Sequence, residues 1–305
     1  MSGVEESDDT MMFCAACGTA EGGDVKLKKC NACKSVRYCG VNCQKEHRPQ
    51  HKRKCKKRAA ELRDEILFKQ PESSHLGDCP ICCLPLPIDN DKFIMMSCCC
   101  KKICNGCAYA NQMRELEMKL LPKCPFCRHS APESEEEAVK NLQKRFEAND
   151  PVAILEMGLR RHTNGDYDSA FEYWKKAAAL GNIFAHHNLS HMYRTGLGVE
   201  KDKKKEVYHS EQAAIGGDII ARYNLGCVEE EHGRMDRAVK HWIINAKLGD
   251  DNALEVLKNK YRAGFVGKED FAAALRAHQA AVDATKSSQR VAAEESNTLT
   301  PLIKF

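Results

Sequence analysis

Residues 14–55, CAACGTAEGGDVKLKKCNACKSVRYCGVNCQKEHRPQHKRKC, are the stretch that decides the fold of the amino-terminal part. The stretch contains two Cys-x-x-Cys pairs, a spacing at which a tight turn brings two thiolates onto one ion. Eight Cys and His donors suffice for two tetrahedral sites, and Zn²⁺ accepts such donors without redox chemistry. The sequence therefore predicts two zinc sites from the candidate ligands Cys14, Cys17, Cys30, Cys33, Cys39, Cys43, His51 and Cys55.

The same stretch has few apolar residues: Val25, Leu27, Val36, Tyr38 and Val41. A chain this short rarely buries enough apolar surface to fold alone. Bound metal would have to supply the folding free energy, about 10–16 kcal/mol per structural zinc in small peptides. Disulfides are the alternative. We expect zinc instead, because the sequence shows no apolar amino-terminal run with a cleavage site, which would indicate secretion. In a reducing compartment the thiols stay free to bind metal.

The ligand order resembles that of the MYND zinc finger, in which an aromatic residue precedes the fifth cysteine and the motif ends in His-x-x-x-Cys. Tyr38 occupies the aromatic position, and His51 begins the ending. The resemblance implies two interleaved sites. Zinc 1 would be held by Cys14, Cys17, Cys39 and Cys43, and zinc 2 by Cys30, Cys33, His51 and Cys55.

MYND fingers bind short proline-containing peptides, so the resemblance also implies a peptide partner. Gln44 matches the family's usual glutamine, whereas Arg48 stands where the family often has tryptophan. His47 is a rival to His51 as a ligand, but it lacks the His-x-x-x-Cys spacing. We interpret His47 as a surface residue.

A second cysteine array spans 79–127, and the two arrays hold all the cysteines except Cys227. Its pairs, central cysteine cluster and following helical pattern resemble a RING finger with cysteine in place of the usual histidine. The resemblance implies that zinc 3 is held by Cys79, Cys82, Cys104 and Cys107. Zinc 4 would be held by Cys124, Cys127 and two of Cys98, Cys99 and Cys100. Because adjacent cysteines reach one tetrahedral ion only with strain, we expect Cys98 with Cys100, and Cys99 is the alternative. Cys83 is expected to point away from the metal.

Many RING fingers recruit a ubiquitin-conjugating enzyme. They do so through an apolar residue in the first pair, a proline in the last pair and a cation just after it. Ile81, Pro125 and Arg128 occupy these places. Alternatively, Ile81 and Pro125 only shape zinc-binding turns, Arg128 is a surface residue, and the module is a docking domain without ligase activity.

The downstream sequence is self-similar at offsets of 36 and then 32 residues, a period typical of stacked helical hairpins. Trp174 and Trp242 occupy equivalent places, with Ser210 between them. Residues 153–285 resemble Sel1-like repeats, with about four hairpins and a glycine-rich loop at 193–202. Such a solenoid presents a groove that binds protein segments. The aligned segments are Ala178–Asn182, Ala214–Asp218 and Ala246–Asp250.

The remaining segments connect or flank these modules. Residues 1–12 are acidic and expected to be disordered, 56–75 form a helix and linker, 128–152 form a connecting helix, and 286–305 form a polar tail. A basic run at 45–58 suggests nuclear localisation or nucleic-acid contact. We favour a solvated helix face, because few aromatic residues interleave with the charges.

The sequence thus predicts small zinc-stabilised fingers plus an all-α solenoid: two cross-braced zinc modules with four Zn²⁺, followed by stacked helical hairpins. The net charge of +4 is too small to indicate nucleic-acid binding, and no apolar run approaches the ~20 residues of a membrane helix. We find no catalytic motif, and closed four-ligand sites leave no position for a catalytic water. We expect an intracellular adaptor, in the cytoplasm and/or nucleus, that binds proteins or peptides through its fingers and solenoid groove. A RING-type ubiquitin ligase is the alternative, and a nucleic-acid-binding regulator is a weaker one.

Overall fold

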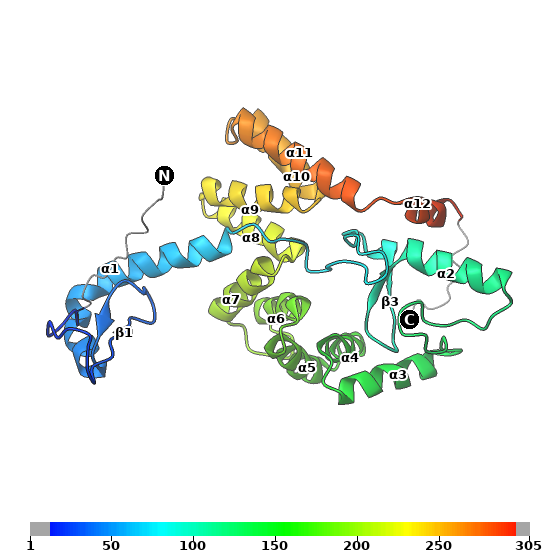
Figure 1. The fold of residues 1–305 in the computed structure, drawn as a ribbon. Helices are drawn as coiled ribbons and strands as arrows, with labels where there is room; N and C mark the ends of the chain where they lie inside the picture. The colour runs from blue at the N-terminus through cyan, green and yellow to red at the C-terminus, as the bar shows by residue number, and fades with distance from the viewer. Residues whose placement is uncertain (1–12, 297–305) are drawn as a thin grey trace, which may run out of the picture. The chain divides into compact units, whose positions relative to one another are not determined.

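The computed structural model describes residues 13–296. The predicted acidic tail at 1–12 and the last residues, 297–305, lie outside the described residues. Contacts divide the chain into two compact units, the first ending at Lys69 and the second beginning at Gln70. The first unit contains the first cysteine array, and the second contains the other array and the helical repeats (Figure 1).

The first unit consists of a small hairpin and one long helix. Strands β1 (Lys28–Lys29) and β2 (Arg37–Tyr38) pair antiparallel. Helix α1 (Val41–Leu67) begins inside the cysteine array and continues beyond it. The basic side chains of 45–58 are mostly exposed along this helix. The structure therefore places them on a solvated face.

The core of this finger is mostly sulfur. Its buried cluster contains Leu27 and Tyr38 together with three cysteines, Cys14, Cys30 and Cys33. Two apolar side chains and some partly buried neighbours bury too little surface to hold the hairpin in place. Bound metal is the remaining source of stability for this fold.

The second cysteine-rich module opens the second unit. It contains the 3₁₀ turn η1 (Asn90–Lys92), the antiparallel strands β3 (Phe93–Met95) and β4 (Lys102–Cys104), and helix α2 (Asn105–Glu117). The linker before the module lies against the repeats, where the His75 N–H donates to the Gly217 carbonyl at 3.1 Å. Helix α3 (Glu135–Glu147) follows the module, and its N-cap residue Ser134 accepts the Glu137 N–H.

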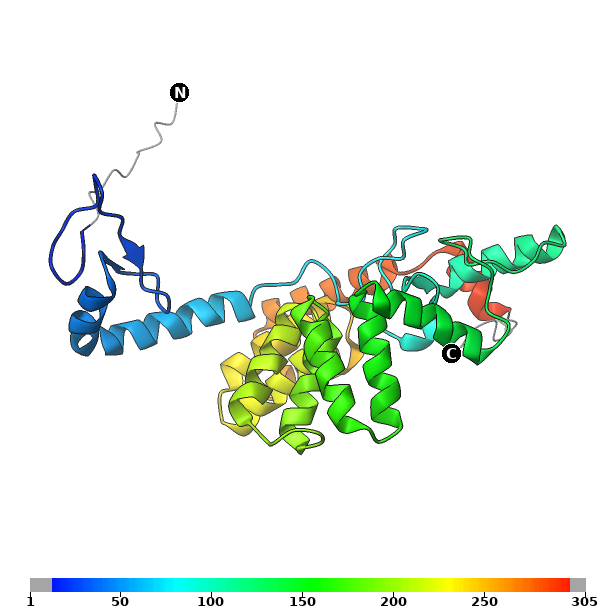
Figure 2. The ribbon, with the colours of Figure 1, turned by 90° about the horizontal axis from the view of Figure 1, so that it is seen from below.

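Four helical hairpins follow α3 in the second unit and stack side by side (Figure 2). Asp or Asn caps six of their eight helices by accepting a first-turn N–H, as Asn182, Asp218 and Asp250 do. The acidic or amide residue at the end of each aligned sequence segment is therefore a helix cap. The pairs are α4 (Pro151–Thr163) with α5 (Tyr167–Ala179), α6 (Ile183–Thr195) with α7 (Lys203–Ile215), α8 (Ile219–Glu231) with α9 (Met235–Lys247), and α10 (Asp251–Arg262) with α11 (Lys268–Ala284).

The recurring tryptophans pack on glycines of the preceding helix. A Cβ atom on Gly158 would lie 2.5 Å from Nε1 of Trp174, and one on Gly226 would lie 2.5 Å from Nε1 of Trp242. Both indoles are buried, so each close approach requires a glycine.

The second hairpin lacks this pair. At the corresponding positions of α6 and α7 stand Ser190 and Ser210, whose hydroxyl oxygens are 2.6 Å apart. A cavity of about 200 Å³ lies beside them. A partly polar cavity therefore lies where the neighbouring hairpins place an indole.

The structure of residues 288–295 differs from the polar tail expected from the sequence. The sequence predicts a polar tail from 286, but helix α12 (Ser288–Glu295) packs against α2 with Arg290 and Ala293 buried. The segment is polar in composition, and these two inward-facing residues are buried against the module. Within residues 13–296, no helix combines the length and apolar character needed to cross a membrane.

Candidate metal centres

Fifteen of the described cysteines and His51 form four clusters of ligand atoms. Within each cluster, the four ligand atoms all lie within 4.8 Å of one another. Both modules interleave their ligands, so each pair of clusters ties distant segments together. The clusters are Cys14, Cys17, Cys39 and Cys43; Cys30, Cys33, His51 and Cys55; Cys79, Cys82, Cys104 and Cys107; and Cys98, Cys99, Cys124 and Cys127.

The spacing of the sulfur atoms fits zinc. A tetrahedral ion with Zn–S bonds of about 2.3 Å separates its sulfurs by about 3.8 Å. The Sγ–Sγ distances are 3.6 Å for Cys17–Cys39, 3.7 Å for Cys30–Cys55 and 3.8 Å for Cys82–Cys104. All the cysteines are free thiols. The four clusters are consistent with four zinc ions.

Local turns and α1 position the ligands of the first unit. The first Cys-x-x-Cys turn is closed by the Gly18 N–H donating to the Cys14 carbonyl at 2.9 Å. His51 and Cys55 lie one turn apart on α1, and His51 Nε2 is 3.2 Å from Cys33 Sγ. One face of the helix therefore brings His51 and Cys55 to the Cys30–Cys33 pair.

His47 lies outside the clusters, but it is not a simple surface residue. It is half-buried, and its Nδ1 is 3.1 Å from the Tyr38 hydroxyl. Its ring stacks on that of the ligand candidate His51, with centroids 5.6 Å apart. His47 therefore supports the orientation of His51 through packing.

The fourth cluster corrects the predicted ligand set. Cys98 Sγ is 3.4 Å from Cys127 Sγ, and Cys99 Sγ is 3.9 Å from Cys124 Sγ. Adjacent cysteines do reach one site here, because each contacts a different member of the last pair. The expected partner of Cys98, Cys100, is not in the cluster.

Cys100 has a packing role instead. Its backbone is left-handed, with φ of 53°, and its side chain packs with Leu142 and Ala153 of α3 and α4. Burial raises the pKa of its thiol to about 12, so the thiol stays neutral. Cys100 thus joins the module to the helices that follow. Cys83, as expected, is exposed and outside the clusters.

Replacing Cys99 and Cys100 separately distinguishes these roles. Cys99→Ala is expected to bind three zinc ions in place of four, because its cluster loses a ligand. Cys100→Ala is expected to keep all four and to lose only some stability through poorer packing. Native mass spectrometry of the two variants measures the counts. Loss of zinc from Cys100→Ala but not from Cys99→Ala would contradict these roles and support the pair Cys98 and Cys100 that the sequence predicted.

Hydrogen bonds within the clusters lower the pKa of some thiols and raise the pKa of others. The Cys17 backbone N–H lowers the pKa of Cys14 to about 6. A hydrogen bond from Cys104 lowers the pKa of Cys79 to about 4, and the Cys79 thiolate in turn raises the pKa of Cys104. Four sulfurs this close cannot all ionise without a cation between them. A divalent ion would complete each cluster.

The three candidate enzyme-contact residues remain on the surface of the second module. Ile81 is 41 % exposed, and Pro125 is half-buried in the last turn. The Arg128 guanidinium donates to Asn111 Oδ1 of α2 at 2.9 Å. The sequence reasoning missed Arg290, which donates to Cys82 Sγ at 3.5 Å. No local sequence signal links an arginine to a cysteine so far upstream.

Comparisons with known proteins support the same division of the chain. Residues 14–55 match the MYND finger model, and residues 151–182 and 183–218 match the Sel1 repeat model. The chain therefore contains a MYND finger and Sel1 repeats, and its second cysteine array suggests another zinc module.

Two curated relatives are both called DAP3-binding cell death enhancer 1. The Rattus norvegicus protein is 35% identical over 72 residues, covering 24% of this chain and 14% of the relative. The Mus musculus protein is 24% identical over 186 residues, covering 48% of this chain and 36% of the relative. The chain thus spans 14% and 36% of the length of these relatives.

Two solved structures are also similar. A Sel1 repeat protein from Oxalobacter formigenes has a TM-score of 0.42 at 24% identity, covering 58% of this chain and 74% of that one. A protective antigen of uropathogenic Escherichia coli with an SLR fold has a TM-score of 0.39 at 21% identity, covering 53% of this chain and 41% of that one.

Proposed function

We propose that this protein is a non-catalytic adaptor in which structural zinc holds two modules that, with the repeats, bind other proteins. The zinc ligands would be the members of the four clusters, with Cys99 in place of Cys100. MYND and Sel1 modules typically mediate protein interactions. Four-ligand clusters are closed sites, which suit a structural and not a catalytic metal.

The cavity in the second hairpin is the observation that carries the proposal for the repeats. Besides Ser190 and Ser210, its lining includes Asn224, Arg194 and the Lys203–Glu206 ion pair, together with apolar side chains of α7 and α8. Within the described residues, Arg194 forms no ion pair. Because the Glu206 carboxylate is paired with Lys203, a partly polar cavity lined by the exposed Arg194 would receive a polar or acidic side chain of a bound segment.

Filling the cavity tests this role. The double variant Ser190→Gly with Ser210→Trp would restore the tryptophan–glycine pair of the neighbouring hairpins, so we expect the repeats to remain folded. We expect the variant to bind the partner proteins of the wild type at least about tenfold more weakly. This is the usual effect of removing one well-packed anchor residue from an interface. Affinity capture with quantitative mass spectrometry, paired with thermal unfolding, measures both.

Tyr208→Trp is the matched control. Tyr208 is exposed on the same helix and does not line the cavity. Its variant is expected to retain all partners. Unchanged capture by the folded double variant would contradict binding at this cavity.

The two relatives are named for binding DAP3, and a binding role for this chain agrees with those names. We propose an intracellular location, because the cysteines are free thiols of the sort that persist in reducing compartments.

Ubiquitin ligation is the second candidate, favoured by the exposed Ile81 beside the first ligand pair of the second module. An autoubiquitination assay with activating and conjugating enzymes tests it. Activity that disappears in Ile81→Ala would replace the adaptor proposal with a RING-type ligase. Nucleic-acid binding by the basic face of α1 is weaker, and absence of binding at ~150 mM salt would end it.

A further inference from the structure

Arg290 is a buried cation without a carboxylate partner. Its side chain belongs to α12 and is only 6% exposed. Its Nη1 donates to the carbonyls of Pro85 at 2.7 Å and Thr285 at 2.6 Å, and its Nη2 donates to that of Leu84 at 3.3 Å. In the part of the chain that the structure describes, no Asp or Glu forms an ion pair with it. Carbonyl dipoles alone compensate a buried guanidinium poorly, so a negative charge must lie nearby.

The remaining contact of Arg290 identifies that charge. Its Nη2 donates to Cys82 Sγ at 3.5 Å, and Cys82 belongs to the cluster with Cys79, Cys104 and Cys107. Four thiolates around one divalent ion carry a net charge of 2−, whereas without the ion the four close sulfurs cannot all ionise and carry less negative charge. The loaded cluster would therefore compensate Arg290 better than the empty cluster.

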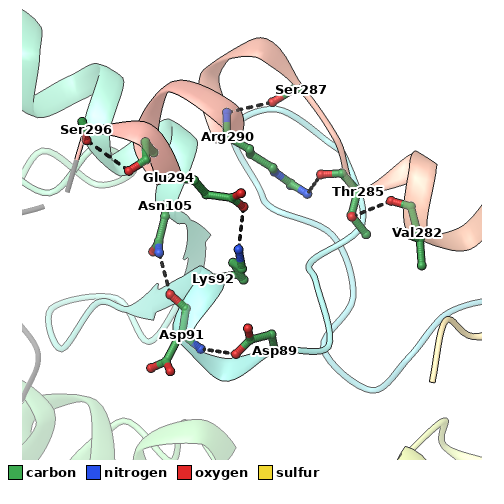
Figure 3. Close-up of polar contacts among 11 residues, drawn as sticks. Asp89, Asp91, Lys92, Asn105, Val282, Thr285, Ser287, Arg290, Glu294 and Ser296 are labelled. Atoms are coloured by element: carbon green, nitrogen blue, oxygen red, sulfur yellow. Dashed lines mark hydrogen bonds and ion pairs between the residues drawn. The ribbon is translucent and has the colours of Figure 1, made fainter. Parts of the chain in front are cut away.

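The backbone of α12 approaches the same cluster closely. A Cβ on Gly106, which lies between the ligands Cys104 and Cys107, would be 2.7 Å from the Arg290 backbone nitrogen and 2.8 Å from its Cγ. Figure 3 shows Ser287 capping the first turn of α12, where the Arg290 N–H donates to its hydroxyl at 3.3 Å. At the exposed side, Lys92 Nζ is 2.7 Å from Glu294 Oε1 (Figure 3).

We propose that Arg290 is the outer-shell cation of the cluster of Cys79, Cys82, Cys104 and Cys107, and that metal at this cluster and docking of α12 stabilise each other. The proposal rests on the proposed zinc ligands. Because coupling between two binding events is reciprocal, removing Arg290 weakens metal binding, and removing the metal loosens α12. The carboxy-terminal helix is thus part of the zinc module, although the repeats separate them in sequence.

Zinc release tests the first half of the coupling in the full-length protein. Arg290→Met keeps the length of the side chain and removes its charge. One of the four zinc ions is expected to pass to a chromogenic chelator about 10–100-fold faster than in wild type, the usual effect of losing an outer-shell partner. Arg290→Lys is expected to fall in between. Glu294→Ala, which removes only the exposed ion pair, is expected to match wild type.

Amide hydrogen exchange in α12 tests the other half. Cys79→Ser removes a ligand and is expected to lower the zinc count by one and to raise exchange across 288–295 at least about tenfold. Gly106→Ala keeps every ligand but crowds Arg290, so faster exchange in α12 and faster zinc release are both expected from it. This variant separates docking from misfolding of the cluster.

Three results would overturn the proposal, and they differ in what else they affect. Wild-type zinc release from Arg290→Met would remove the role of Arg290 alone. Unchanged exchange in α12 of Cys79→Ser would remove the coupling alone. An unchanged zinc count in Cys79→Ser would contradict the ligand set itself, and with it the proposed zinc-held module.

Discussion

Replacing Cys33 with serine is expected to unfold the finger of the first unit. Cys33 is 1% exposed and lies 3.2 Å from His51 Nε2 in the second cluster. A structural zinc contributes on the order of 10–16 kcal/mol to such a small fold, which exceeds what its two buried apolar residues can supply. The hairpin of 28–38 should become protease-sensitive, and the zinc count should fall by one or two because the sites interleave.

The helical repeats provide an internal reference for this experiment. They belong to the other compact unit, so their thermal unfolding should stay unchanged in Cys33→Ser. Lys28→Ala, an exposed change in the same hairpin, is the matched control and should bind four zinc ions. A Cys33→Ser variant with four ions and a protected hairpin would contradict the assignment of Cys33.

Replacing Trp242 with alanine is expected to destabilise the repeats by about 3–5 kcal/mol, the range for deleting a large buried aromatic side chain. Trp242 is 1% exposed and packs directly on Gly226 in the core of the third and fourth hairpins. Glycine leaves no side chain that could move into the space, so the cavity should persist. Denaturant unfolding followed by circular dichroism measures the free energy.

Two features sharpen this measurement. Trp174 is the only other tryptophan, so its fluorescence reports on the first hairpin in the variant. Phe265→Ala removes an aromatic side chain that is 56% exposed, and it should cost less than about 1 kcal/mol. A loss of similar size in both variants would contradict the tight packing of Trp242 on Gly226.

Local patterns and family resemblance predicted much of the architecture. The alanine, glycine and Asp or Asn positions recur because each hairpin needs close helix packing and a helix cap, and both requirements are visible in sequence. The grouping of the first array came from the ordered spacing of Cys14 to Cys55 and its resemblance to the MYND finger. The structure brings the same ligands together.

The sequence-based predictions that were wrong concern residues whose position depends on packing against distant parts of the chain. Neighbouring sulfurs at Cys98, Cys99 and Cys100 are chemically equivalent, and only the left-handed turn at Cys100 and its burial against α3 and α4 select two of them. Likewise, the segment 288–295 has an unremarkable polar composition. Its helix is held by Arg290 against a module more than half the chain away, which no local pattern reveals.

The metal content of the full-length protein tests the central claim most directly. Native mass spectrometry under non-reducing conditions, with elemental analysis of the same sample, gives the number and identity of the bound ions. The four clusters predict four zinc ions per chain and no disulfide. Two or fewer zinc ions, or a mass showing cysteines bonded to one another, would contradict the zinc-held architecture.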